Sequence, residues 1–306
     1  MLAVPASAFA LTGATTATGH SEQNPVNLRV SPGRVKFGHA VSVTGAAPSA
    51  DAGKQVLLET AARTARAWQR TAATTVDANG RFRFRVVPRR SSLLRALVQA
   101  SVGTAPAASG AAVETSSDVP STTLRAVTVT ARFAIGHHRF SILGGGPVHV
   151  GGNLLPALPG RSVRLQGRTS RGWLTLATGR TGARGDFRLR YAPAGGTPQG
   201  LRMVFAGDDR NGRSVQSAGS VTVYDQSVAS WYDDGGNTAC GFHAGRGVAN
   251  RTLPCGSKVA FHYGNRTVTA VVDDRGPYVG GREWDLNQNT AAALGFSGVG
   301  TVWSSR

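Results

Sequence analysis

The feature that most constrains the fold is an internal repeat. Three segments of the first half of the chain recur about 105 residues later: GKQVLL at 53–58 as GRSVRL at 160–165, Trp68 as Trp173, and GRFRFR at 80–85 as GDFRLR at 185–190. A period of this length is too long for a solenoid unit and predicts two copies of a domain of about one hundred residues. The chain has 306 residues, which leaves room for a third domain after the second copy.

Each copy alternates apolar and polar residues with a period of two. Phe82 and Phe84 point to one side of such a strand, and Arg83 and Arg85 point to the other. The turn signal DANG at 77–80 precedes this strand, and the 40 glycines of the chain fit many short turns. The pattern predicts an all-β protein, and the two copies look like the Ig-like β-sandwich repeats of bacterial surface proteins.

Composition divides the chain into segments. The stretch 101–124 is rich in Ala, Ser, Gly, Thr and Pro without periodicity, which is typical of a linker or long loop. Beyond about residue 224, Trp and Tyr appear and Gly-rich turns become dense. The predicted organisation is a signal-like or disordered segment at 1–24, Ig-like domain 1 at 25–100, the linker, Ig-like domain 2 at 125–224 and a C-terminal domain at 227–306.

The first residues predict export. The segment 1–18 is small and apolar with an A-x-A site at 6–8, like the end of a secretory signal peptide, although the basic n-region is missing. We therefore expect a secreted protein that is extracellular or in the cell wall. No run reaches the roughly 18 to 20 apolar residues of a spanning helix, so no transmembrane segment is predicted.

Charge is distributed unevenly along the chain. It carries 34 Lys and Arg against 16 Asp and Glu, a net charge of +18, and residues 225–306 hold equal numbers of the two signs. The excess therefore falls on the two repeats. A cationic surface of this size attracts polyanions, and we expect anionic cell-wall polymers as partners of the Ig-like domains. No specific nucleic-acid partner is predicted, because few aromatic residues lie between the arginines and no binding module is recognisable.

Several spaced motifs of the C-terminal segment carry a family resemblance: ASWY at 229–232, TLPCG at 252–256, DRGPY at 274–278, WDL at 284–286 and AAALG at 291–295. In this order they resemble the rare-lipoprotein-A-like double-psi β-barrel, in the disulfide-bearing form of actinobacterial wall proteins. The resemblance implies a six-stranded barrel at 227–306 that acts on peptidoglycan glycan strands.

The residues of this segment also predict local structure directly. The β-rich runs 258–263 and 266–272 are separated by Gly264-Asn265, which is a type I′ hairpin signal. Residues 285–294 predict a short helix, with Gly295 just beyond its end. Gly276-Pro277 forces a turn directly after Asp274, so we expect this carboxylate at a strand end that faces a groove.

Asp274 and Asp285 are the candidate catalytic residues. Cleaving a glycosidic bond needs a carboxylic acid that protonates the leaving oxygen and a second group that manages the oxocarbenium-like charge. We assign the acid/base role to Asp274 and an assisting role to Asp285. In the related transglycosylases one acid serves twice, and an anhydro ring closes without water. Structural alternatives stay open: Asp274 pairs with an arginine or accepts turn amides, and Asp285 caps the helix.

The candidate substrate-binding residues are Tyr232, Asn250, Arg275, Tyr278 and Arg282. The two tyrosines are assigned to the groove because aromatic faces suit the apolar face of a pyranose. Trp231 and Trp303 are assigned to the barrel core. Catalytic members of the resembled family have a histidine two residues before the TLP motif, where this chain has Asn250. An amide orients a sugar but exchanges no proton near pH 7, and this departure weakens the enzyme assignment.

Cys240 and Cys255 are the only cysteines, and an even number in an exported chain predicts one disulfide. The alternative is a zinc site, in which His243 and His262 complete a set of four ligands with the two cysteines. The spacing of these four residues fits no familiar zinc module. We predict no metal and no cofactor. His243 is also a candidate to replace the missing family histidine.

Three functions follow from these patterns. The preferred one is a secreted wall protein whose barrel binds peptidoglycan and cleaves it as a lytic transglycosylase. The first alternative is a non-catalytic, expansin-like module that binds or loosens the wall. In the second alternative, the Ig-like part docks a protein partner and the barrel is vestigial.

Overall fold

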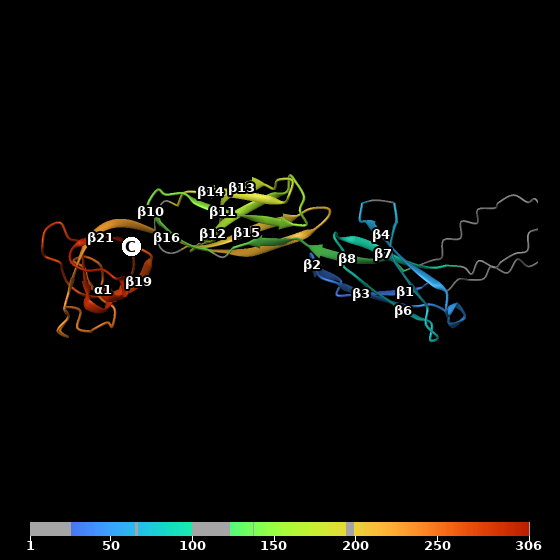
Figure 1. The fold of residues 1–306 in the computed structure, drawn as a ribbon, viewed down its shortest axis with the longest axis horizontal. Helices are drawn as coiled ribbons and strands as arrows, with labels where there is room; N and C mark the ends of the chain where they lie inside the picture. The colour runs from blue at the N-terminus through green and yellow to red at the C-terminus, as the bar shows by residue number, and fades with distance from the viewer. Residues whose placement is uncertain (1–25, 65–66, 100–122, 137, 194–198, 306) are drawn as a thin grey trace, which may run out of the picture.

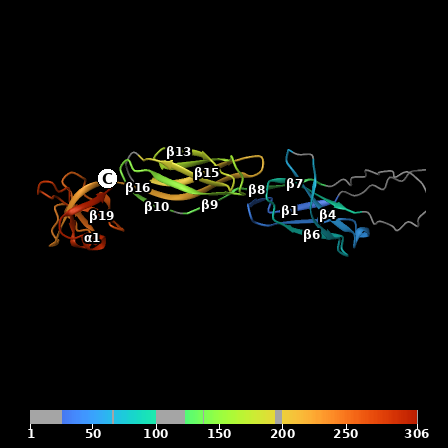
Figure 2. The ribbon, with the colours of Figure 1, turned by 45° about the horizontal axis from the view of Figure 1, so that its top comes forward.

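The computed structural model describes residues 26–64, 67–99, 123–136, 138–193 and 199–305. Strands dominate these residues, and the single α-helix among them is α1 (Gln288–Leu294), so the predicted all-β class is confirmed. The signal-like segment predicted at 1–24 lies outside the described residues, as does most of the predicted linker at 101–124. The described part contains no helix with the length and apolarity that crossing a membrane requires. Figures 1 and 2 show three bodies in a row, in chain order.

The first body is a sandwich of two sheets. One sheet has the order β1-β3-β6 and the other β2-β8-β7-β4-β5. Phe82 and Phe84 are buried in the shared core while Arg83 and Arg85 are exposed, as the alternation predicts. Its described elements are β1 (Asn27–Ser31), β2 (Arg34–Lys36), β3 (Val41–Ala46), the short 3-10 turn Ser49–Asp51, β4 (Gln55–Ala62), β5 (Gln69–Thr75), β6 (Arg81–Val86), β7 (Ser92–Val98) and β8 (Arg125–Thr130).

The second body repeats this topology strand for strand. Its sheets have the orders β9-β11-β14 and β10-β16-β15-β12-β13, and the bulge between β4 and β5 recurs at the same place between β12 and β13. The duplication read from the sequence therefore extends to strand pairing, while the Ig-like name stays a prediction. The strands are β9 (Arg132–Ile135), β10 (His138–Leu143), β11 (Val148–Leu155), β12 (Ser162–Thr169), β13 (Gly172–Arg180), β14 (Asp186–Tyr191), β15 (Gln199–Gly207) and β16 (Gly212–Tyr232).

Two strands run across the boundaries expected from composition. The second domain is predicted to start at 125, yet β8 pairs with β7 and buries Val127 and Val129 in the first core. The change in composition near 224 falls inside β16, which buries Val221 in the second core and Ala229 in the third. The last strand of the second sandwich is therefore also the first strand of the barrel.

The third body is a closed six-stranded barrel. Besides β16 it contains β17 (Gly247–Ala249), β18 (Lys258–Tyr263), β19 (Arg266–Asp274), β20 (Trp284–Asn287) and β21 (Gly300–Ser304). They pair in the order β16-β20-β17-β19-β18-β21, and β21 pairs with β16 again, which closes the ring. Closure leaves no sheet edge, and Phe261, Trp284 and Leu286 are fully buried inside.

The predicted hairpin and helix are both present in the barrel. β18 and β19 pair around Gly264-Asn265, and Gly264 has a φ of 57°, in the left-handed region that favours glycine. The predicted turn type I′ is wrong, because it needs a positive φ at both central residues and no described residue other than glycine has one. Asn287 caps α1 by accepting a hydrogen bond from the Thr290 amide, and Gly295, with φ 70°, ends the helix as predicted. The helix cap is thus Asn287, and the alternative that Asp285 caps the helix is wrong, because Asp285 lies in β20. The core assignment of Trp231 is also wrong, since this residue is 45% exposed.

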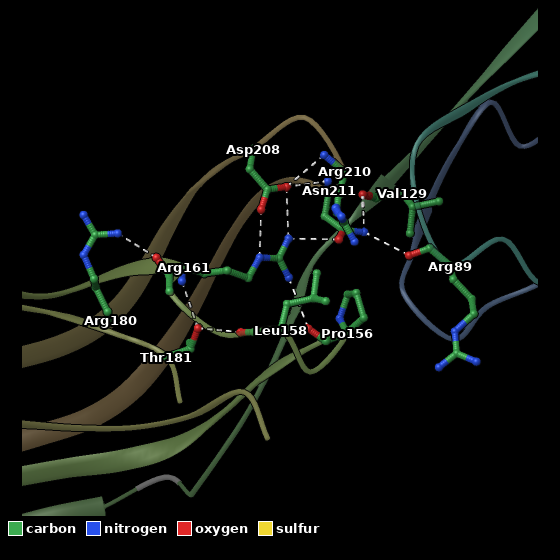
Figure 3. A network of polar contacts seen from close by, with 11 residues as sticks. Arg89, Val129, Pro156, Leu158, Arg161, Arg180, Thr181, Asp208, Arg210 and Asn211 are labelled. Carbon is green, nitrogen blue, oxygen red and sulfur yellow. Dashed lines mark hydrogen bonds and ion pairs between the residues drawn. The ribbon is translucent and has the colours of Figure 1, made fainter. Parts of the chain in front are cut away.

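A buried arginine fixes the junction between the two sandwiches (Figure 3). Arg161 is 6% exposed, and its guanidinium donates to both oxygens of Asp208, at 2.8 and 3.1 Å, and to Asn211 Oδ1 at 2.9 Å. Asn211 in turn donates to the carbonyls of Arg89 and Val129 in the first sandwich. Burial disfavours the charge of Asp208, but the hydrogen bonds from Arg161 and backbone amides outweigh it and lower its pKa.

Removing this guanidinium should destabilise the second sandwich. Because Arg161→Met removes the side-chain donor to Asp208 and Asn211 and leaves Asp208 with the backbone amides of Arg210 and Asn211, we expect a loss of about 2 to 3 kcal/mol in the free energy of unfolding. The matched control is Lys54→Met at the repeated position of the first sandwich, where the exposed ion pair with Asp51 should contribute below about 1 kcal/mol. Differential scanning calorimetry separates the domain transitions, and equal shifts for the two variants would contradict this account.

Candidate functional site

The barrel places both predicted catalytic aspartates in one row across its wall. Ala249 of β17 is the register partner of Asp274 in β19 on one side and of Asp285 in β20 on the other. Ser230 of β16 is the partner of Asp285 and continues the row. Adjacent strands lie about 4.8 Å apart, so the backbones of the two aspartates are about 10 Å apart with a small alanine between them. The sequence prediction that these carboxylates share a site is therefore consistent with the strand pairing.

Asp285 has the environment of a protonated acid. Its Oδ1 atom is buried and has no hydrogen-bond partner among the described residues. Burial raises the pKa of Asp285, and the negative charge of Asp274 raises it further, whereas the Ser230 hydroxyl and Arg282 act in the opposite direction. A raised pKa favours the protonated form of a carboxyl group, which can donate its proton to a bound oxygen atom.

Asp274 is held differently. Its Oδ1 atom accepts hydrogen bonds from the backbone amides of Ala239 and Arg275, both at 2.8 Å. The predicted alternative of turn amides is therefore part of its environment, and two amide donors suit a carboxylate that carries negative charge. Tyr232 lies beside it: burial raises the pKa of the Tyr232 phenol, and the carboxylates of Asp274, Asp273 and Asp234 add to the increase. The hydroxyl therefore stays protonated as a donor.

A loop at 233–246 covers the end of β19. It supplies the Ala239 amide to Asp274 and the Ala244 amide to Asp273 Oδ2. Asp273 is fully buried and its pKa is raised by burial, with a further contribution from Asp234. Asp273 precedes Asp274 in β19 and is thus shielded from solvent, with the Ala244 amide of this loop bound to its carboxylate.

The same loop contains the histidine and the first cysteine considered above. His243 Nε2 forms an ion pair with Asp234 Oδ2, next to the buried Asp273. Cys240 and Cys255 form a disulfide, which confirms the predicted bridge. The zinc alternative is wrong, since both sulfur atoms are bonded to each other, and no group of metal-binding residues is found in the described residues.

Two of the predicted substrate-binding side chains form hydrogen bonds to the backbone of the loop at 250–255. Asn250 is 5% exposed, and its Oδ1 accepts from the amides of Thr252 and Leu253. Arg275 Nη1 donates to the carbonyls of Asn250 and Leu253, both at 3.0 Å. Both side chains therefore hold the TLPC loop against the strand end that carries Asp274.

The remaining predicted residues lie at the barrel surface. Tyr278 follows the Gly276-Pro277 turn and is 82% exposed, while Tyr232 is half-buried. Arg282 and Asn250 line a hollow of about 420 Å³ beside residues 226–228 in the last part of β16. Neither catalytic aspartate is among its lining residues, so the structure separates this hollow from the row of carboxylates.

Buried polar atoms without partners concentrate in this barrel. Among the described residues, those atoms are Ser230 Oγ, the Tyr232 hydroxyl, Asp234 Oδ2 (apart from its ion pair with His243), Asp273 Oδ1, Trp284 Nε1 and Asp285 Oδ1. Most buried polar groups in proteins are hydrogen-bonded, so these exceptions are unusual, and Ser230 and Asp285 among them lie in the row described above. Sequence reasoning missed Ser230 and Asp234. Ser230 was detectable by its same-face spacing with Tyr232, whereas no sequence signal singled out Asp234.

Comparison with known proteins identifies the barrel. Residues 224–303 match the double-psi β-barrel family described as lytic transglycolase. The "Probable endolytic peptidoglycan transglycosylase RlpA" of Synechocystis sp. (strain ATCC 27184 / PCC 6803 / Kazusa) is 36% identical over 99 residues, which cover 29% of this chain and 31% of that protein. The chain therefore matches about a third of the length of that curated relative.

Similarities to solved structures are weaker. One is a chain from a study of T cell specificity and activation by the bacterial superantigen toxic shock syndrome toxin-1, with a TM-score of 0.25, 10% identity and coverage of 30% of this chain and 98% of that one. Another is a chimeric titin Z1Z2-Z1Z2 tandem, with a TM-score of 0.24, 11% identity and coverage of 65% and 96%. Scores of this size carry no argument about the fold.

The disulfide should stabilise the barrel through the loop that it closes. For a closed loop of this length, the double variant Cys240→Ser/Cys255→Ser should lower the free energy of unfolding of the barrel by about 3 kcal/mol, because the unfolded chain regains conformational freedom. Chemical denaturation followed by near-UV circular dichroism measures this change. Reduction of the wild type should give the same shift, and an unchanged transition after full reduction would contradict the prediction.

Proposed function

Because the C-terminal domain is a rare-lipoprotein-A-like double-psi β-barrel, we propose that this protein is a secreted cell-wall protein that binds peptidoglycan glycan strands and cleaves them as a lytic transglycosylase. Asp285 and Asp274 are the reacting pair. The observation that carries this proposal is the partnerless, buried oxygen of Asp285 in the same row as the amide-bound carboxylate of Asp274.

The environments of the two aspartates suggest their roles. Asp285, with its raised pKa, protonates the bridging oxygen as the glycosidic bond breaks, and the bonding electron pair leaves with that oxygen. The negative charge of Asp274 stabilises the oxocarbenium-like centre. Asp285 then takes the proton from a hydroxyl group of the same sugar, whose oxygen bonds to the anomeric carbon and closes the anhydro ring. These roles are the reverse of those suggested by the sequence, which made Asp274 the acid/base and Asp285 the assisting residue.

Aromatic and basic residues near the row are suited to hold the glycan. Tyr278 and Trp231 expose 82% and 45% of their surface and offer faces on which sugar rings stack. Arg282 lies close enough to Asp285 to lower its pKa and is available to carboxylates on the substrate. The two basic sandwiches adhere to anionic wall polymers and keep the barrel at the wall.

A second candidate is wall binding without turnover. It is favoured by Asn250, which replaces the histidine of catalytic relatives and whose carboxamide is already engaged by the amides of Thr252 and Leu253. In this case the barrel retains the wall polymer through the same surface, and no bond is broken.

Substituting either aspartate tests the enzymatic proposal. Asp285→Asn removes the acid and Asp274→Asn removes the stabilising charge, so release of anhydro-muropeptides from purified peptidoglycan should fall by at least about a hundredfold in each. Asp225→Asn, an exposed residue of β16, serves as the control and should keep wild-type turnover. Wild-type protein that sediments with insoluble peptidoglycan yet releases no product would overturn the enzymatic proposal in favour of the second candidate.

The pH dependence of turnover tests the role of Asp285 separately. An acid with a raised pKa is active while protonated, so turnover should decrease as the pH rises through that pKa. Since Arg282 lowers the pKa of Asp285, Arg282→Gln should move this decrease in turnover, the alkaline limb of the pH profile, to higher pH. The measurement is the pH profile of kcat for both proteins, and a limb that stays in place or moves to lower pH would exclude Asp285 as the acid.

A further inference from the structure

The five-stranded sheet of the second sandwich is uniformly cationic. The described residues of β10, β12, β13, β15 and the sandwich part of β16 (212–224) contain no Asp or Glu. Alternation along the strands directs Arg164 and Arg168 of β12 to the same outer face as Arg202 of β15. Arg213 of β16 adds a further positive charge near Arg202. An anion that reaches this face therefore meets positive charge from three neighbouring strands.

Arg202 is the centre of this face. Its Nε donates to Gln166 Oε1 at 2.9 Å, and its guanidinium lies 4.0 Å from the ring centroid of Trp173. Arg168 lies 5.6 Å from the same ring. Desolvation lowers the pKa of Arg202, and the charges of Arg213 and Arg168 lower it further, which is the effect of like charges without a counter-ion. Gln166 and the indole ring orient the guanidinium without neutralising it.

The first sandwich contains the same arrangement in neutral form. Arg95 lies 4.3 Å above the Trp68 ring, as Arg202 lies above Trp173. Its cross-strand partner is Glu59, which occupies the position of Gln166 and forms an ion pair with Arg95 at 2.8 Å. Two differences therefore separate the cationic cluster from the neutral pair: Gln166 stands in place of Glu59, and Arg168 stands in place of Ala61.

We propose that Arg168, Arg202, Arg213 and Trp173, here called the Arg202 cluster, form a binding site for the anionic groups of a wall polysaccharide. The ligand is a phosphate or carboxylate carried on a sugar or polyol chain, which the guanidinium of Arg202 binds through paired hydrogen bonds. The equivalent position of the first sandwich does not bind such a group, because its arginine, Arg95, already forms an ion pair with Glu59. This inference rests on the proposed adhesion of the basic sandwiches to anionic wall polymers and assigns that adhesion to one sheet.

The geometry favours a polysaccharide over a nucleic acid. Nucleic-acid sites combine charge with free aromatic faces on which successive bases stack. Here the cluster offers one indole ring, and Arg202 already lies over it. The cluster therefore has no free aromatic face on which several bases could stack. A phosphate or carboxylate requires only N–H donors of the guanidinium groups to bind.

The test exchanges the residues that distinguish the two sandwiches. In the full chain, Gln166→Glu introduces the carboxylate of the first sandwich and should weaken binding about tenfold. Glu59→Gln removes that carboxylate and should add a weaker second site, since Ala61 stands where the second sandwich has Arg168, which gives the experiment a gain of binding as well as a loss. Isothermal titration with a glycerol phosphate polymer and with polygalacturonate distinguishes the phosphate from the carboxylate source, and neutral dextran is the control that should not bind.

Three outcomes would overturn the inference. The first is equal affinity of wild type and Gln166→Glu for both polyanions, with both proteins folded by circular dichroism. The second is no additional site in Glu59→Gln. The third is tighter binding of a single-stranded DNA oligomer than of either polymer, lost in Gln166→Glu, which would make the partner a nucleic acid. The titrations use soluble polymers without peptidoglycan, so their result is independent of whether the barrel cleaves glycan.

Discussion

One strand carries the hydrogen bonds on which the arrangement of the C-terminal half depends. β16 pairs with β10 and β15 in the second sandwich and then with β20 and β21 in the barrel. The backbone of β16 is hydrogen-bonded to neighbouring strands both before and after residue 224. No unpaired linker therefore separates the second sandwich from the barrel along this strand. Ser230 and Tyr232 of the candidate site are therefore on the same continuous strand as Arg213 of the Arg202 cluster. A polymer held at the sandwich meets the barrel at a position set by this strand.

The sandwich junction and the barrel differ in whether their buried polar groups have hydrogen-bond partners. At the sandwich junction, the buried Asn211 side chain and Arg161 guanidinium have hydrogen-bond partners. In the barrel, Asp273 and Asp285 each keep a buried oxygen without a partner among the described residues. Burying a carboxyl group in this way costs stability unless it is protonated or bound. The cost falls in the domain that matches the lytic transglycolase family, and destabilising features of this kind cluster at functional sites of proteins.

Local patterns predicted most of the fold. Alternation around Phe82 and Phe84 predicted a sandwich strand, and Gly264 and Gly295 predicted the hairpin turn and the helix end, because each of these signals acts within a few residues. Strand pairing across long separations could not be predicted. Nothing near residue 125 indicates that β8 returns to the first sheet after a long connection, and nothing in the sequence around Ala249 shows that it pairs with both aspartates. The role of Asn250 is a different case, because its side chain accepts from the amides of Thr252 and Leu253, a local turn contact that the sequence could have indicated.

The disulfide connects the fold of the site to its chemistry. Cys240 lies in the loop that donates the Ala239 amide to Asp274, and Cys255 lies in the loop that Arg275 holds through two carbonyls and, at 2.9 Å, through the Cys255 sulfur atom. The disulfide thus ties the two loops to each other, and the Arg275 guanidinium ties the second of them to the end of β19. A loop with few apolar anchors would otherwise exchange its amides with water, and the charge on Asp274 would lose its fixed donors. The disulfide therefore helps to hold in place the loop whose Ala239 amide donates to Asp274.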